Sequence, residues 1–217
     1  MKVRWLMDLR SQYYAVVLFI VMVFSVPLIL TVECVAADED VVSQQRPVSV
    51  DIHQLIKQSE QSELGVDLNI LKEIDVDAAS LIAKTRGKLF LNGLTVITPE
   101  VAEALAKHRG WLHLDGLQSL SPEVATALSK HQGWLFLNGI KVLDEDVAVA
   151  LVTYQGQLYL DGVEAITEDV AEVIAKRRNG VELYGVRDIN YQSVAILRKN
   201  SEIILPAKFN RAGWWPF

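Results

Sequence analysis

The side chains best suited to chemistry lie in the middle of the chain. His113 and Asp115 are two residues apart, which is the spacing that places two side chains on the same face of a strand. A histidine beside a carboxylate occurs in many hydrolytic sites, but those sites also need a nucleophile. No serine or cysteine occupies the neighbouring strand positions. We therefore expect no catalytic residue here.

A second candidate for catalysis is the pair Asp115 and Asp161, which occupy equivalent positions two predicted strands apart. Strand spacing puts them about 9.6 Å apart, close to the separation of the two carboxyl groups in inverting glycosidases. Their face would be open and wet, with nothing to keep one carboxyl protonated. The sequence therefore predicts a protein that is not an enzyme.

The histidines give no metal-binding pattern. His108 and His131 recur at the ends of predicted helices, where a cation complements the helix dipole. His53 is isolated. We expect neither a metal nor another cofactor.

These residues are positioned by a repeat of 23 residues. From Gly87 the chain reads GKLFLNGLTVITPEVAEALAKHR, GWLHLDGLQSLSPEVATALSKHQ, GWLFLNGIKVLDEDVAVALVTYQ and GQLYLDGVEAITEDVAEVIAKRR, and the first two copies agree at 13 of 23 positions. A period of this length indicates stacked units that bury their apolar faces against one another.

Each unit begins as a strand and continues into a turn. Two leucines alternate with other residues, as in Leu89 and Leu91, and this spacing predicts a half-buried strand. An Asn-Gly or Asp-Gly dipeptide follows in four units, at Gly93, Gly116, Gly139 and Gly162, and Gly185 continues the glycine column after a tyrosine. We expect the Asn or Asp side chain to bond the backbone just ahead, and the glycine to have a positive φ.

The second half of each unit predicts a helix. A second apolar position is followed by a residue suited to cap a helix: Thr98, Ser121, Asp144, Thr167 or Asn190. Val101, Ala102 and Leu105 recur as the buried face, and Glu103 with Lys107 form an outer pair. Parallel strands joined by helices predict an α/β right-handed solenoid, with the sheet on the inner face and the helices outside.

The pattern from about residue 64 to 206 resembles the leucine-rich repeats, through its LxLxG core, the branched residue after the glycine and a helix in every unit. One departure is that the family's usual inward asparagine is replaced by an aliphatic residue, such as Leu94 or Leu117. The Asn or Asp before each glycine is then expected to take over part of its role. The resemblance implies binding and scaffolding, without a particular partner.

The N-terminus indicates export. Basic residues before residue 11 precede an apolar run from residue 15 to 32, which is long for a signal peptide and just long enough to span a bilayer. We interpret residues 1–37 as a signal peptide, with cleavage after Ala37, or as a signal anchor. Either form places the repeats in the periplasm, cell envelope or extracellular space. Cys34 is the only cysteine, and Glu33 before it argues against lipidation.

The remaining boundaries follow from the repeat. Residues 38–64 are expected to form a spacer and an N-terminal capping helix, residues 65–206 the solenoid, and residues 207–217 an aromatic tail. In the last repeat we expect Ile204 in the first core position of the strand and Pro206 in the second. The tail either caps the last repeat or contacts a partner or membrane surface. The net charge of −6 and the lack of a basic stripe argue against nucleic-acid binding.

The predicted inner face carries a concentration of rings. The partner-binding candidates are Phe90, Trp111, His113, Trp134, Phe136 and Tyr159. These rings either stabilise the sheet or form a recognition surface. Our hypothesis is an exported protein that binds another protein through this face. An envelope glycan-binding module and a structural envelope protein with no dedicated ligand are the alternatives.

Overall fold

The computed structural model describes residues 52–59 and 65–210, which belong to the compact unit Val48–Phe217. The predicted signal peptide or anchor, the spacer before residue 52 and the tail residues 211–217 lie outside the described residues. In the described ranges, no helix has the length and apolar character needed to cross a membrane.

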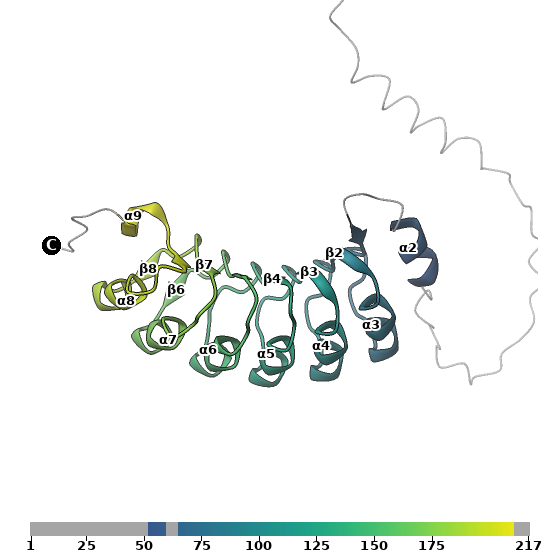
Figure 1. Ribbon diagram of the computed structural model, residues 1–217, viewed down its shortest axis with the longest axis horizontal. Helices are drawn as coiled ribbons and strands as arrows, with labels where there is room; N and C mark the ends of the chain where they lie inside the picture. Colours follow the sequence, from purple (N-terminus) through teal and green to yellow (C-terminus); the bar gives the residue numbers. More distant parts are fainter. Residues whose placement is uncertain (1–51, 60–64, 211–217) are drawn as a thin grey trace, which may run out of the picture. The chain divides into compact units, whose positions relative to one another are not determined.

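The described chain alternates short parallel strands with helices (Figure 1). The strands of the main sheet are β1 (Val66–Asp67), β2 (Arg86–Phe90), β3 (Arg109–His113), β4 (Trp134–Phe136), β5 (Leu158–Tyr159), β7 (Val181–Glu182) and β9 (Ile203–Ile204), in that order. A second parallel pair consists of β6 (Ala165–Ile166) and β8 (Asp188–Ile189). The predicted α/β class, its parallel sheet and its alternation with helices are confirmed.

From β1 to β7, the strands of the sheet pair residues that are 23 positions apart, which is the length of the sequence repeat. Leu89 pairs with Leu112, which is followed by Leu135 and Leu158 in the next strands. Each strand therefore presents the same column positions as its neighbours, and its leucines point into one continuous core.

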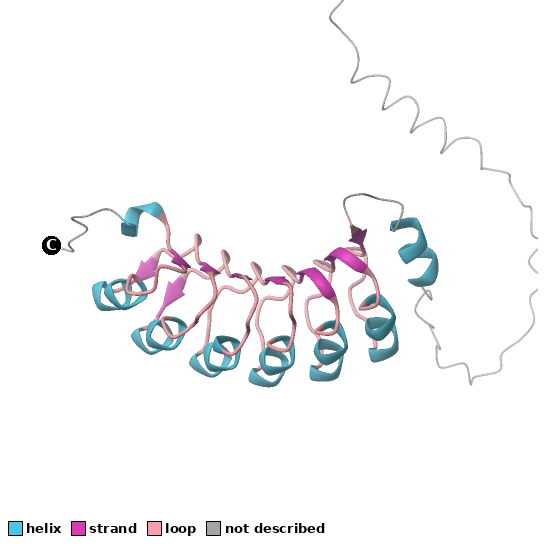
Figure 2. Cartoon of the chain, viewed as in Figure 1, coloured by secondary structure: helices cyan, strands magenta, loops and turns pink. Residues whose placement is uncertain are grey.

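The helices pack against one side of the sheet and leave the other side uncovered (Figure 2). They are α3 (Val76–Ile82), α4 (Pro99–Leu105), α5 (Pro122–Leu128), α6 (Glu145–Val152), α7 (Glu168–Ile174) and α8 (Tyr191–Leu197). Val101, Ala102 and Leu105 are buried against the sheet, as predicted. The cap side chain accepts a hydrogen bond from the backbone N–H three residues on at Asp75, Thr98, Ser121, Thr167 and Asn190, whereas Asp144 makes no such bond.

The two ends of the described core are covered by helices of their own. At the start, α2 (Ile52–Ser59) buries Ile56 and lies within the range in which a capping helix is expected. At the far end, α9 (Ala207–Asn210) buries Phe209.

The predicted register of the last strand is wrong by one residue. Ile203, and not Ile204, pairs with Val181, so Leu205 takes the second core position in place of Pro206. Ile204 faces solvent with 37% of its surface exposed. The last unit is thus one residue shorter than the others.

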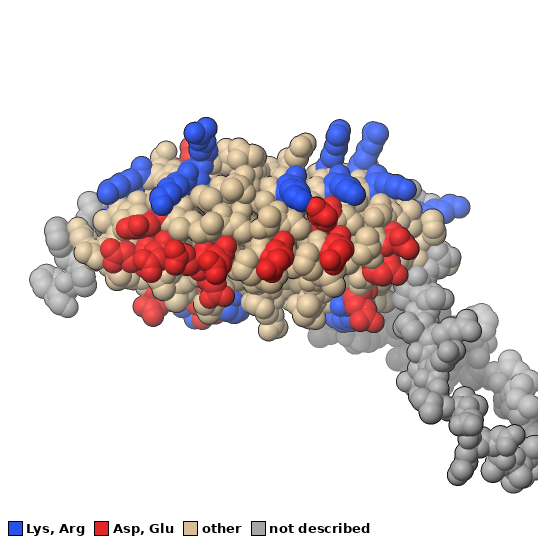
Figure 3. Space-filling model, turned by 90° about the horizontal axis from the view of Figure 1, so that it is seen from below, with Lys and Arg blue, Asp and Glu red and all other residues tan. Residues whose placement is uncertain are grey.

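Charge is segregated on the helical side of the molecule, where acidic and basic side chains form separate rows (Figure 3). Acidic residues fill the first turns of several helices, where they complement the helix dipole. The predicted pair of Glu103 with Lys107 is not the closest one, because the Glu103 carboxylate bonds to Lys130, in the turn just after α5. The ion pair therefore joins two repeats.

The predicted positive φ at the turn glycines is wrong. In the described chain the glycines with positive φ are Gly65, Gly87 and Gly110, and none belongs to the turn column. Gly116 is required by close packing instead, since a Cβ there would lie 2.2 Å from the carbonyl oxygen of Asn92 and 2.4 Å from that of Leu94. Ile70 occupies the same column in the first unit, where no earlier turn of the described chain packs against it, and it is 69% exposed.

This difference predicts the effect of adding one methyl group. Gly116→Ala should lower the free energy of unfolding by about 2–4 kcal/mol, because two carbonyl groups of the preceding turn must move. Ile70→Gly is the matched control and should change it by at most about 1 kcal/mol. Urea unfolding measures both values. A Gly116→Ala protein as stable as the control would contradict the close-packing explanation.

Candidate functional site

The structure brings the six predicted partner-binding residues together on the sheet face that the helices leave uncovered. Trp111 pairs with Trp134 in one column, and His113, Phe136 and Tyr159 follow one another in the next. Phe90 begins the second column through its pairing with His113. We refer to these six residues as the aromatic columns.

The rings of the aromatic columns stack on one another. Ring centroids are 4.5 Å apart for Trp111 and Trp134, near the usual spacing of about 4.8 Å between neighbouring strands. In the second column the successive distances from Phe90 to Tyr159 are 4.4, 3.9 and 4.1 Å, with interplanar angles of 24°, 9° and 9°. Both faces of His113 and Phe136 are therefore covered by neighbouring rings, and these two residues present only their ring edges to an external contact. Trp134 is the most accessible, at 40% exposure.

The two columns end differently. The Lys88 ammonium lies 4.4 Å from the ring centroid of Trp111, a cation–π contact that closes the first column. The second column ends at Tyr159, which pairs with Glu182. Burial is the main cause that raises the pKa of the Glu182 carboxyl, and the charge of Asp161 is the second cause. Burial also raises the pKa of Tyr159, with further contributions from Glu182, Asp161 and Tyr184.

His113 is held inside the stack. Its Nδ1 lies 3.6 Å from Oδ2 of Asp115, while its Nε2 is buried and has no hydrogen-bond partner among the described residues. Rings on both sides shield it, so a substrate could approach only along the ring edge. This geometry suits packing better than proton transfer.

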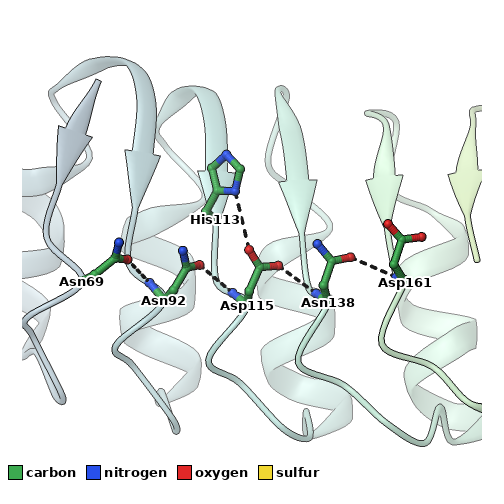
Figure 4. Close-up of polar contacts among 6 residues, drawn as sticks. All are labelled: Asn69, Asn92, His113, Asp115, Asn138 and Asp161. Carbon is green, nitrogen blue, oxygen red and sulfur yellow. Dashed lines mark hydrogen bonds and ion pairs between the residues drawn. The ribbon is translucent and has the colours of Figure 1, made fainter. Parts of the chain in front are cut away.

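A polar ladder runs beside the aromatic columns, at the ends of the strands (Figure 4). Its members are Asn69, Asn92, Asp115, Asn138 and Asp161, and each Oδ1 accepts a hydrogen bond from the backbone N–H of the residue 23 positions later, at 2.7 to 3.0 Å. The expectation that these side chains bond their own turns is therefore wrong. They connect each repeat to the next.

A second polar column was not predicted from the sequence. The side chains of His108, His131, Tyr154 and Arg177 are almost completely buried, and each donates to the carbonyl oxygen of a residue 21 positions earlier, at 2.5 to 3.1 Å. The predicted dipole role of the two histidines at helix ends is thus replaced by inter-repeat hydrogen bonding. The signal in the sequence was a polar residue at the same position of every repeat.

Burial shifts the pKa values of three residues of the second polar column, His131, Tyr154 and Arg177. It lowers the pKa of His131, with a contribution from nearby His108, and it lowers the pKa of Arg177 to about 10. Burial also raises the pKa of Tyr154. Because Nε2 of His131 must donate to the Gly110 carbonyl, the neutral ring has an unprotonated Nδ1, which lacks a partner among the described residues.

No cluster of three or more metal-ligating side chains occurs within residues 52–59 and 65–210.

Comparisons of the chain with protein-family models, with curated proteins and with solved structures found no match.

The polar ladder predicts which substitutions are tolerated. Asn138→Asp should change the free energy of unfolding by less than about 1 kcal/mol, because aspartate already serves at two other positions of the ladder. Asn138→Leu leaves the Asp161 N–H without its acceptor and should cost about 1–3 kcal/mol. Chemical unfolding of both variants tests this. Equal stabilities would show that the hydrogen bond is dispensable.

The second polar column predicts a loss of stability in acid. Burial depresses the folded-state pKa of His131 below its unfolded value of about 6.5. The stability that neutral His131 contributes is therefore fully present above about pH 6.5, and it is lost as the pH falls from there toward the folded-state pKa. His131→Tyr copies Tyr154 of the next repeat and should lose less stability between pH 7.5 and 5. Urea unfolding at both pH values measures the difference. The same loss in both proteins would contradict a role for His131.

Proposed function

We propose that this chain is an exported, non-enzymatic solenoid of the leucine-rich-repeat type that binds another protein through its aromatic columns. The observation that carries the proposal is the pair of continuous stacked columns on the uncovered face of the sheet. Rings held rigidly by their neighbours lose little entropy when a partner binds, which makes them suitable anchors.

The solenoid assignment is supported by contacts that link each repeat to the next in the same way. Pairing in register, glycine contacts and ladder bonds all join equivalent positions of successive units. Such nearest-neighbour contacts are typical of repeat proteins. Export is supported by the apolar segment near the N-terminus, which lies outside the described residues.

The ring geometry favours a protein ligand over a glycan. Sugars commonly bind aromatic residues through the flat face of the ring, because the axial C–H groups of the sugar lie against the π system. Here the faces of His113 and Phe136 are covered by their neighbours at 3.9 to 4.4 Å. Ring edges, the partly exposed Trp134 and the adjacent polar ladder match the mixed surface of a protein better.

A site-specific crosslink tests the proposal. A photoreactive benzoylphenylalanine in place of Trp134 should capture one protein from an envelope extract, whereas the same group in place of Glu103, on the outer side of α4, should not. The captured protein is then purified and its affinity for the unmodified chain measured. A control incubation with a polysaccharide array detects glycan binding.

Substitution of the anchors gives the quantitative prediction. Trp134→Ala combined with Phe136→Ala should weaken binding of the captured protein about 30-fold or more, because both changes remove contact area at the centre of the columns. Glu103→Gln should leave it unchanged. Circular dichroism melting establishes that the double variant is folded. A folded double variant with undiminished affinity, or binding to the polysaccharide array alone, would overturn the proposal.

A further inference from the structure

The uncovered face of the sheet has its own cation at one end and uncompensated acids toward the other. Lys88 lies over Trp111 near the N-terminal side of the sheet. Toward the C-terminal side, Tyr159, Asp161, Glu182 and Tyr184 lie at adjacent positions of β5, β7 and the turns that follow. We call these four residues the acidic corner.

Two equivalent repeats show why the acidic corner is unusual. Asp115 has His113 two residues before it, with Nδ1 of the histidine 3.6 Å from its Oδ2. Asp161 occupies the same place in the polar ladder, but Tyr159 replaces the histidine. Its Oδ1 accepts the Tyr184 N–H at 3.0 Å, and its other oxygen has no ion-pair partner among the described residues.

Glu182 adds a second carboxylate to the same place. It is half-buried beside Tyr159, and burial, with a smaller contribution from Asp161, raises the pKa of its carboxyl. No Lys, Arg or His side chain of residues 52–59 and 65–210 lies within ion-pair distance of it. A cation from outside would relieve both carboxylates, and the Tyr184 ring, 53% exposed, offers an apolar surface for the chain that carries it.

We propose that the acidic corner binds a lysine or arginine side chain of the protein partner. This inference rests on the proposed function, because it names the chemistry of the partner at one end of the aromatic columns. The ammonium or guanidinium group lies between the carboxylates of Asp161 and Glu182, and its aliphatic stem packs on Tyr184. Lys88 on Trp111 is an equivalent cation–π contact made within the chain.

The test uses synthetic twelve-residue peptides as probes and the full chain as receptor. Pools share a central Lys, Arg or Glu, with the other positions randomised among Leu, Phe, Ser and Thr. The tightest Lys binders are resynthesised with Nε-acetyl-lysine, which keeps the stem and removes the charge. Acetylation should weaken binding to the wild-type chain about tenfold.

The receptor variants locate the effect. In Asp161→Asn combined with Glu182→Gln, acetylation should change affinity less than about twofold, as expected once the opposing charges are absent. Asn already serves in the polar ladder at Asn92 and Asn138, so this change preserves the acceptor. Glu164→Gln combined with Glu172→Gln removes the same charge from exposed positions elsewhere and should retain the wild-type response.

The outcomes separate this inference from the proposed function. One outcome would overturn the inference alone: peptides bind the wild type, do not bind the Trp134→Ala, Phe136→Ala protein, and keep the same affinity when the lysine is acetylated. An acetylation effect that persists in the Asp161→Asn, Glu182→Gln protein would place the cation elsewhere and also overturn it. Absence of binding by every pool would overturn both. Dimers of the free wild-type chain that this variant lacks, detected by sedimentation, would assign the acidic corner to a second copy instead.

Discussion

The close approach of one repeat's backbone to the next is the constraint on which the rest of the structure depends. At Gly116 the preceding turn lies so near that no side chain fits between the two. The same approach brings the Asn92 side chain within 2.9 Å of the Asp115 N–H, so the space that excludes a Cβ also makes the hydrogen bond possible. Stacked turns would otherwise leave these backbone donors without partners. Glycine and the Asn or Asp before it thus serve one contact together.

Two polar systems hold the repeats together at different depths. The polar ladder is half-buried at the ends of the strands, whereas His108, His131, Tyr154 and Arg177 lie almost fully inside. Different donors satisfy equivalent carbonyl groups: an imidazole at His131, a phenol at Tyr154 and a guanidinium at Arg177. What the position requires is a hydrogen-bond donor of sufficient reach, and the ring stacking along the column accommodates the change in chemistry. Among the described residues, neither system bonds to a ring of the aromatic columns, apart from the contact of His113 with Asp115.

The sequence predicted those features that depend on local pattern and missed those that depend on a neighbouring repeat. Alternating leucines, cap residues such as Thr98 and the placement of the aromatic columns followed from spacing alone. Gly116 was misread because a positive φ and a close backbone contact both demand glycine. The two buried histidines were assigned to the helix dipole, since the pattern within one repeat places them at a helix end and does not show the carbonyl group of the preceding repeat. The predicted register of the last strand was wrong by one residue because Ile203, Ile204 and Leu205 are all apolar and fit either register.

The first and last units differ from the others in ways that show what a unit needs. Ile70 replaces the turn glycine only where no earlier turn of the described chain is stacked on it, so the demand for glycine comes wholly from the preceding neighbour. A unit with glycine at this position can therefore stack on another copy of itself. Duplication of one complete 23-residue segment within the gene would therefore insert a new rung with its ladder and core intact, and would lengthen the uncovered face by about 4.8 Å. The length of this surface is consequently a heritable variable that can change by whole steps without redesign of the fold.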